Sequence, residues 1–314
     1  MRKELGTFVI LLVLCVVVTA IQPRFLGGAN LQNMARLIGM YGIFSIGIGV
    51  VIITGGIDLS VGSMFALLGV LLSIFLAGWG WPGALAVAAV VGVAVALGLA
   101  HGLLITRLRI QPFIVTLCGL LFYRGLARFI ADDETKGFGA GRGFEWLTTL
   151  ATGSLFGVPA PFLLLVLIAA VMWVVLHRSV YGRYLFAVGR NEEAARYSGI
   201  NAKAVVASAY VISGLMAGIA GVLLAFYTNS VSPSSHGNFF ELYGIAAAVL
   251  GGCSLRGGEG SVVGIIIGAA LLQVLQNLVN LLGIPSSLNF AVMGAVILVG
   301  VVADQLLSRR SKMA

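Results

Sequence analysis

The chain has 314 residues, of which 60% are hydrophobic and 10% charged, and its formal net charge is +8. Soluble globular domains carry about 25% charged residues, so this composition excludes an ordinary soluble domain and indicates a polytopic helical membrane protein. A membrane β-barrel would alternate apolar and polar residues in strands of about ten residues, and the sequence has no such alternation. Cationic loops at one membrane face, rather than a nucleic-acid-binding surface, account for the positive charge.

Ten apolar segments follow one another along the chain, and we expect an all-α fold of about ten transmembrane helices, some short or broken. Segment 241–253 is too short to span a bilayer, so we expect a half-helix or the extension of a helix that begins earlier. No stretch between the segments is long enough for a second domain, so residues 1–314 are predicted to form one transmembrane domain. The segments are 5–22, 35–54, 60–78, 83–105, 112–130, 160–177, 204–226, 241–253, 260–282 and 286–304.

The positions of Lys and Arg orient these segments, because cytoplasmic loops carry an excess of both residues. Most cations fall on one face if the N-terminus is cytoplasmic, and the C-terminus is then cytoplasmic too. On this topology residues 131–159 form an outer loop and residues 178–203 an inner loop. The apolar run after Arg2 and Lys3 also fits a signal peptide cleaved near residue 20. An uncleaved first helix keeps the downstream charges consistent, and we favour it.

The glycine-rich segment 54–62 carries a carboxylate, Asp58, between two apolar runs. A bare charge in hydrocarbon costs from about 2.5 to above 10 kcal/mol, so Asp58 needs a partner, a water-filled path or an irregular backbone. Glycines permit such a backbone. One interpretation is a broken helix that lines a solute path through Asp58, Ser60 and Ser63. The alternative is a short cytoplasmic turn in which Asp58 and Ser60 cap the next helix.

A second glycine-rich segment, residues 251–258, also separates two apolar runs. Paired interruptions in the two halves of a membrane protein point to a transport path, although two glycine pairs in so glycine-rich a chain also arise by chance.

Four amide side chains recur at offsets of three, four and seven in the ninth segment, which places them on one stripe of a helix. Amides hydrogen-bond to hydroxyl groups, so the stripe is a candidate pore lining for a neutral polyol such as a sugar. The alternative is amide bonding between helices, worth about 1 kcal/mol each. The four are Gln273, Gln276, Asn277 and Asn280.

Arg124 and Arg128 lie four residues apart near the outer end of the fifth segment. They either face an aqueous vestibule or extend to the lipid headgroups. The predicted topology places them at the opposite end of the membrane from Asp58, so a link between Arg124 and Asp58 stays open.

The inner loop contains a helix signal rather than a plain linker. Asn191 is a plausible N-cap, Glu192 and Glu193 supply acids to the first turn, and Gly199 is placed to end the helix. A short helix on the cytoplasmic surface can dock into a groove of another protein. The alternative is a solvated basic loop.

Motifs for enzyme chemistry are lacking in the sequence. It has no His-Glu-x-x-His pair, no Gly-x-Ser-x-Gly elbow and no phosphate-binding loop, and its three cysteines have no metal-ligand spacing. We therefore expect no catalytic residue, no metal site and no cofactor bound by this chain.

Four stretches of the sequence are each weak as a motif, but their order and spacing along the chain are specific when they are taken as a set. They are residues 55–62, 112–125, 182–201 and 246–260. Together they resemble the membrane-spanning permease of bacterial ABC importers for monosaccharides, the ribose-type group.

The resemblance implies two permease subunits, identical or paralogous, around a central pathway in the bacterial inner (plasma) membrane. It also implies a pair of cytoplasmic ABC ATPases that bind ATP and Mg, and a periplasmic binding protein that delivers the sugar. The identity of the sugar and of the second permease stays open. Carried over to this chain, the ATPase-coupling residues are Gly189, Arg190, Asn191, Glu192, Ala194, Ala195, Ser198 and Gly199.

Two other transport functions stay open. One is an autoinducer-type or other sugar-like solute permease of the same fold. The other is an ion-coupled secondary transporter, against which stands the lack of paired intramembrane acids in the sequence.

Overall fold

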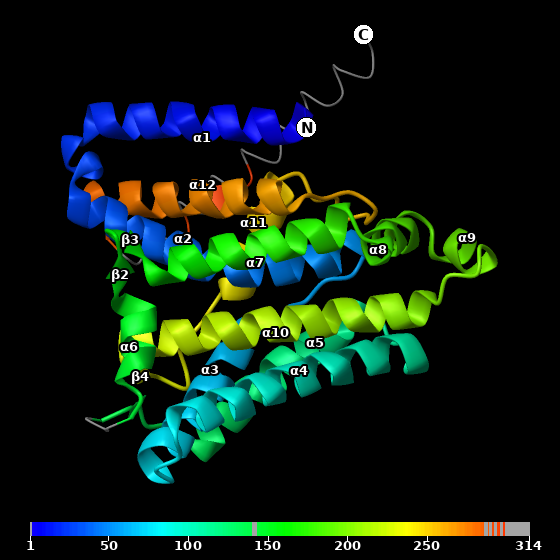
Figure 1. The fold of residues 1–314 in the computed structure, drawn as a ribbon, viewed down its shortest axis with the longest axis horizontal. Helices are drawn as coiled ribbons and strands as arrows, with labels where there is room; N and C mark the ends of the chain where they lie inside the picture. The colour runs from blue at the N-terminus through cyan, green and yellow to red at the C-terminus, as the bar shows by residue number, and fades with distance from the viewer. Residues whose placement is uncertain are drawn as a thin grey trace.

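The computed structural model describes residues 2–139 and 143–285, with five single positions beyond them at 288, 291, 294, 295 and 298. This part of the chain is a bundle of long helices that run along one common direction (Figure 1). The predicted tenth segment, 286–304, and the C-terminal cations lie outside the described residues, apart from those single positions.

Eight helices in the described ranges are long and apolar enough to cross a membrane, which confirms a polytopic all-α fold. The third of them, α3, continues into a π-helical turn, η2 (Ile74–Gly78). The predicted eighth segment is the short helix α11 (Phe240–Leu250), as its length indicated. The long helices are α1 (Arg2–Ile21), α2 (Gly28–Ile53), α3 (Val61–Ser73), α4 (Gly83–Leu108), α5 (Pro112–Ile130), α7 (Ala160–His177), α10 (Ala202–Thr228) and α12 (Val262–Leu281).

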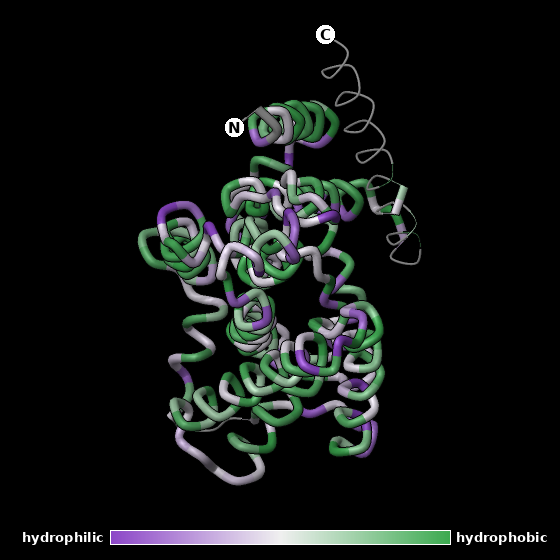
Figure 2. The backbone as a smooth tube through the Cα atoms, turned by 90° about the vertical axis from the view of Figure 1, so that its right-hand side faces the viewer, coloured by the Kyte–Doolittle hydropathy of each residue, from purple (hydrophilic) through white to green (hydrophobic). Residues whose placement is uncertain are grey.

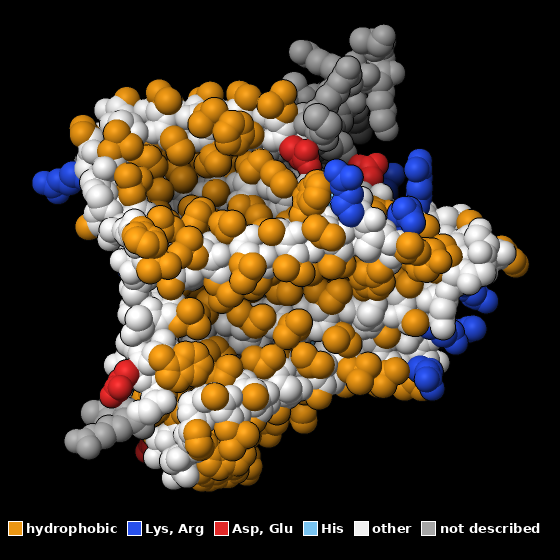
Figure 3. Space-filling view, viewed as in Figure 1, with side chains coloured by type: hydrophobic (Ala, Val, Ile, Leu, Met, Phe, Trp, Pro, Cys, Tyr) orange, Lys and Arg blue, Asp and Glu red, His pale blue; other side chains and the backbone are white. Residues whose placement is uncertain are grey.

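Two ends of the bundle differ in charge (Figure 3). Lys and Arg side chains gather at the end where α4 and α7 finish and α10 begins. We call this the basic end, and it is the end that the positive-inside rule places in the cytoplasm. The two helices of the predicted inner loop, α8 (Val180–Arg190) and α9 (Glu192–Tyr197), project from it.

The described parts of the predicted outer loop, residues 131–139 and 143–159, lie at the opposite end of the bundle. They contain α6 (Glu145–Thr152) and the hairpin of β2 (Ser154–Leu155) and β3 (Val158–Pro159). Strand β1 (Lys136–Gly137) pairs antiparallel with β4 (Ser230–Val231), which follows α10. Phe138 stacks on Phe226 of α10 with ring centroids 4.5 Å apart, so this loop is fastened to the core.

The N-terminal helix α1 packs on α12 and on the short helix η1 (Pro23–Leu26). Val18 and Phe25 are buried there against Val274. Figure 2 shows α1 as an outlying apolar helix above the rest of the bundle.

Helix α10 lies at the centre of the bundle between α2, α3 and α4. Its crossing with α4 depends on small residues, because a Cβ on Gly102 would stand 2.7 Å from the Cα of Ala207. Side chains at such positions would push the two backbones apart, so glycine allows the close packing that holds membrane helices together.

The chain leaves helical geometry twice inside the bundle, at residues 54–60 and 229–239, which we call the two re-entrant segments. The first follows the basic end of α2 and runs back into the bundle before α3 begins (Figure 1). The second returns from the opposite end of α10 to the start of α11. The two segments therefore enter from opposite ends and meet in the interior.

The alternative of a short cytoplasmic turn around Asp58 is wrong. The carbonyl oxygen of Ile57 accepts hydrogen bonds from Tyr210 at 3.1 Å and Thr116 at 3.4 Å, inside the bundle. Ser213, which bonds Asp58, lies about 17 Å along α10 at 1.5 Å per residue. That distance is about half of the ~30 Å hydrocarbon core, so Asp58 lies near mid-membrane.

Candidate functional site

Asp58 is held by three hydrogen bonds in the first re-entrant segment. Its Oδ1 accepts from the backbone N–H of Ser60 at 3.0 Å and from the Ser60 hydroxyl at 2.7 Å. Its Oδ2 accepts from the hydroxyl of Ser213 on α10 at 2.7 Å. The side chain is 1% exposed, so these donors replace the water that an ionised carboxylate would otherwise bind.

The other two residues predicted with Asp58 are also buried. Ser63 donates to the carbonyl of Ser60 at 2.8 Å, and both residues are fully shielded from solvent. Ser60 precedes α3 directly but makes no side-chain cap bond. The structure therefore brings Asp58, Ser60 and Ser63 together, and contact of any of them with a solute requires a different arrangement of the helices.

A second buried acid, Glu241, lies at the start of α11 and packs against Gly62 at the start of α3. It is 6% exposed. The N-terminal ends of both helices thus face the interior, where the partial positive charge of a helix N-terminus favours a carboxylate. Discontinuous helices that point their N-termini at the membrane centre are a feature of transporter binding sites.

Arg124 joins the second re-entrant segment to the start of α3. Its guanidinium donates to the carbonyl oxygens of Pro233 at 3.1 Å, His236 at 2.8 Å and Gly62 at 3.3 Å. Arg124 therefore neither extends to the lipid headgroups nor faces an aqueous vestibule. The predicted placement of Arg124 and Asp58 at opposite ends of the membrane is also wrong. The reason is that segment 54–60 runs into the membrane, so Gly62 reaches the level of Arg124, about 18 Å along α5.

Arg128, one helical turn further along α5, has a different environment. It donates to both carboxylate oxygens of Asp133, at 2.6 and 2.9 Å, on an exposed surface. The hydrogen bond from Arg128 lowers the pKa of Asp133. Arg128 is thus a surface residue, whereas Arg124 belongs to the interior site.

Three buried polar atoms near these elements have no hydrogen-bond partner within the described ranges. They are Oγ of Ser45, Nδ1 of His101 and Nε2 of His236. The other ring nitrogen of His101 bonds the hydroxyl of Tyr123 at 2.8 Å. Buried polar atoms are nearly always paired, so these three are positions where water or a solute hydroxyl is expected.

Sequence reasoning missed Glu241, His236 and Ser213. The sequence could have indicated Glu241, because this acid stands at the start of the short apolar segment 241–253, as Asp58 stands just before α3. The inference that the chain lacks paired intramembrane acids is therefore wrong, because Asp58 and Glu241 share one buried region with Arg124 as a nearby cation. His236 and Ser213 carried no signal, since only the folded chain brings them to this site.

The four amides of α12 separate into different environments. Asn277 and Asn30 of α2 exchange hydrogen bonds through their amides, at 2.7 and 3.1 Å. This pair is the interhelical amide bonding of the alternative interpretation. Gln273 is 2% exposed beside Tyr41, Gln276 lies beside Tyr243, and Asn280 is exposed.

The inner loop forms two helices where one was predicted. Asn191 caps α9 as expected, because its side-chain oxygen accepts from the N–H of Ala194 at 3.0 Å. Gly199 follows with a φ of +83°, a left-handed conformation that suits a helix end. The solvated-loop alternative is wrong.

The predicted coupling residues do not form one surface. Arg190, Asn191, Glu192, Ala194, Ser198 and Gly199 are exposed. Ala195 is 5% exposed and anchors α9 to the core, and Gly189 packs against other backbone segments. The most exposed large side chain of this loop is Tyr197, 90% exposed, which the sequence did not single out.

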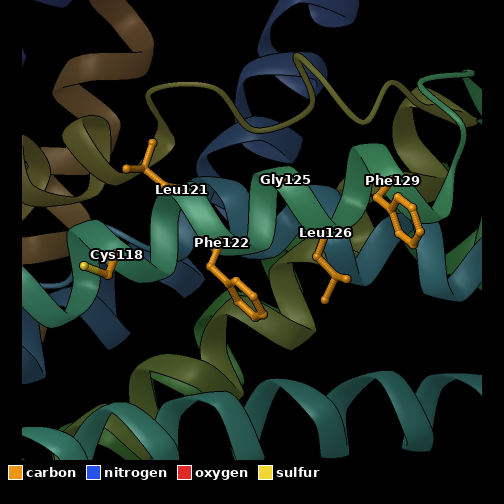
Figure 4. Close-up of a pocket in the computed structure, with 6 residues that line it drawn as sticks. All are labelled: Cys118, Leu121, Phe122, Gly125, Leu126 and Phe129. Carbon is orange, nitrogen blue, oxygen red and sulfur yellow. The ribbon is translucent and has the colours of Figure 1, made fainter.

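A hollow of about 560 Å³ lies on the outer surface of α5 (Figure 4). Its walls are apolar side chains and Gly125, all from the same helix. A sugar needs several hydrogen-bonding groups, so this hollow is not a candidate sugar site. It is lined by Cys118, Leu121, Phe122, Gly125, Leu126 and Phe129.

Comparison with known proteins places the chain among permeases. Residues 30–301 match the family described as the permease component of a branched-chain amino acid transport system. The chain is 38% identical to the ribose import permease protein RbsC of Bacillus subtilis over 304 residues, which covers 96% of this chain and 93% of that protein. It is 36% identical over 301 residues to RbsC of Escherichia coli K12, with the same coverage.

A xylose permease is also similar. The chain is 33% identical to the xylose transport system permease protein XylH of Escherichia coli K12 over 344 aligned positions, which covers 91% of this chain and 87% of that protein. No solved structure matches the chain.

Proposed function

The chain belongs to this family of transport-system permeases and is a multi-pass inner-membrane protein, and from that premise we propose that it is the membrane subunit of an ATP-driven importer that carries a monosaccharide into the cytoplasm. The similarity to sugar import permeases along almost the entire chain is the observation that carries this proposal. Ribose and xylose, for which the relatives are named, are the first sugars to test.

The energy source in this proposal is a pair of cytoplasmic ABC ATPases that hold ATP and Mg. The exposed helix α9 at the basic end is the part of the chain on which an ATPase docks, and its exposed residues include Glu192, Ala194 and Tyr197. A second permease, identical or paralogous, completes the pathway, and a periplasmic binding protein delivers the sugar at the opposite end.

The site where α3 and α11 begin supplies the moving part. Asp58 ties the first re-entrant segment to α10, and Arg124 ties the second to the start of α3, where Glu241 also packs. ATP shifts the protein between inward- and outward-open arrangements only through its different affinity for the two. In this mechanism the re-entrant segments separate or realign, and Asp58, Ser60, Ser63 and Gln273 of α12 then face the sugar path.

Reconstitution tests the proposal directly. Proteoliposomes that contain the chain, its ATPase and its binding protein should accumulate labelled ribose or xylose only when ATP and Mg are supplied on the ATPase side. A preparation without the ATPase is the control.

A second function, ion-coupled transport, is favoured by one observation, the two buried acids Asp58 and Glu241. The chain alone in liposomes under a proton or sodium gradient distinguishes the two. Uphill sugar uptake in that preparation would replace the ATP-driven proposal.

A further inference from the structure

Three chain segments meet backbone to backbone at the basic end of the bundle. They are the end of α2 with the start of the first re-entrant segment, the end of α8, and the turn between α11 and α12. Glycines stand at each contact. We call Gly55, Gly189, Gly257 and Gly258 the glycine junction.

The contacts leave no room for a side chain. A Cβ on Gly257 would stand 2.5 Å from the carbonyl oxygen of Gly189 and 2.9 Å from the nitrogen of Gly55. A Cβ on Gly189 would stand 2.6 Å from the nitrogen of Gly258 and would overlap the carbonyl of Ile53. Neighbouring backbone, unlike a flexible side chain, cannot swing away to accept such an atom.

A hydrogen bond ties the junction together. The N–H of Gly258 donates to the carbonyl oxygen of Ile53 at 2.8 Å, which satisfies one of the carbonyls left unpaired at the end of α2. The turn that presents Gly258 is itself closed, because Gly257 N–H donates to Ser254 O at 2.8 Å and Ser254 N–H to Glu259 O at 3.1 Å. The turn is therefore closed by its own hydrogen bonds, and it packs between the end of α2 and the end of α8.

The junction connects the inner loop to the first re-entrant segment and to the turn between α11 and α12. Helix α8 leads directly into α9, Gly55 lies three residues before Asp58, and the turn joins α11 to α12. Close-packed backbone transmits a displacement because it can neither compress nor slide past itself. A movement of α8 thus reaches the segment that holds Asp58 and the helix that carries Glu241.

We propose that the glycine junction makes α8, residues 53–58 and the turn 254–259 move as one body, and that Gly189 is the positioning residue through which the inner loop drives the two re-entrant segments. This inference rests on the proposed function, in which the inner loop is where the ATPase acts.

Substitution of Gly189 separates docking from transport. In a system that contains the ATPase and the binding protein, Gly189→Ala should keep the ATPase bound and hydrolysing ATP, because α9 remains exposed, while sugar uptake falls by about tenfold. Gly92→Ala is the matched control, since Gly92 is also helical and its added Cβ would meet nothing within 4 Å. Normal uptake by Gly189→Ala would overturn the inference.

A cross-link tests the same inference by comparing one variant before and after reduction, so that the steric effect of its new side chains is the same in both states. A Cβ on Gly258 would stand 3.0 Å from Cβ of Arg190, near the 3.5–4.5 Å separation of a disulfide. The double variant Arg190→Cys with Gly258→Cys should form the disulfide, and its uptake should be the same before and after reduction, because the joined elements do not move relative to each other. Each single variant under the same oxidant controls for bonds to Cys253.

The outcomes separate the two proposals. Uptake that stops on cross-linking and returns with reductant would overturn the junction, as would failure of the disulfide to form in a double variant that still transports. Sugar uptake by the wild-type chain without ATP would instead overturn the proposed function.

Discussion

The Ser213 hydroxyl donates to Oδ2 of Asp58 at 2.7 Å, across 155 positions of sequence. It is the bond that ties the first re-entrant segment to α10 through the carboxylate, since the other two donors to Asp58 come from Ser60 itself. A buried carboxylate depends on such donors, and their removal leaves it partly unsolvated.

Loss of this hydroxyl should lower stability. Ser213→Ala removes one hydrogen bond to a buried charged group and should cost about 2 kcal/mol of unfolding free energy, measured by chemical denaturation in detergent. Ser154→Ala, at an exposed position of strand β2, is the control and should change stability little. Equal stability of both variants would mean that the bond contributes nothing.

Arg124 and Arg128 should respond differently to the same substitution. Arg124→Leu leaves three buried carbonyl groups without their donor and Glu241 without a nearby cation, so we expect a loss of about 3–5 kcal/mol or failure to accumulate in the membrane. Arg128→Leu breaks a surface pair and should cost no more than about 1 kcal/mol.

Membrane abundance and thermal unfolding of the two leucine variants are the measurements. Arg124→Lys keeps the charge but loses the forked geometry, so it should be intermediate. Similar behaviour of the variants at positions 124 and 128 would contradict an interior role for Arg124.

Two adjacent alanines of α9 should separate docking from folding. Ala194 is exposed, so Ala194→Glu should weaken co-purification of the ATPase while thermal stability stays within about 0.5 kcal/mol of wild type. Ala195 is buried, so Ala195→Glu places an unpaired charge in the core and should lower the melting temperature. A reversed pattern would show that α9 presents its other face.

The amide pair between α2 and α12 is suited to a double-mutant cycle. Asn277→Ala removes both hydrogen bonds between Asn277 and Asn30 and should cost about 0.6–2 kcal/mol, whereas further substitution of Asn30 by Ala should add only the loss of its bond to the Phe25 carbonyl. Asn280→Ala, at an exposed position, is the control. Additive effects in the cycle would remove the structural role of the pair and favour pore lining by Asn277.

Cys253 should be unreactive in the folded protein. Burial raises the pKa of its thiol to about 12, so only about one molecule in ten thousand carries the thiolate at pH 8. N-ethylmaleimide, followed by mass spectrometry, should leave Cys253 unmodified in detergent micelles and label it after unfolding in dodecyl sulfate. Equal labelling before and after unfolding would show that the turn next to α11 is open.

Much of the architecture could be read from local pattern. The lengths of apolar runs predicted the long helices and the short α11, and the cap at Asn191 predicted α9. The family resemblance was also present in motif order and is confirmed by the comparisons. These features are local because helix periodicity, capping and hydrophobic length depend on residues a few positions apart.

The interior site was only half predictable. Asp58 drew notice because an acid between apolar runs demands an explanation, yet its partner Ser213 and its neighbour Glu241 did not. The contacts of Arg124 and Gly189 came from tertiary structure alone. A non-helical segment has no periodicity to reveal its path, so whether residues 54–60 turn at the surface or enter the membrane depends on donors more than a hundred residues away and on glycines that let distant backbones touch.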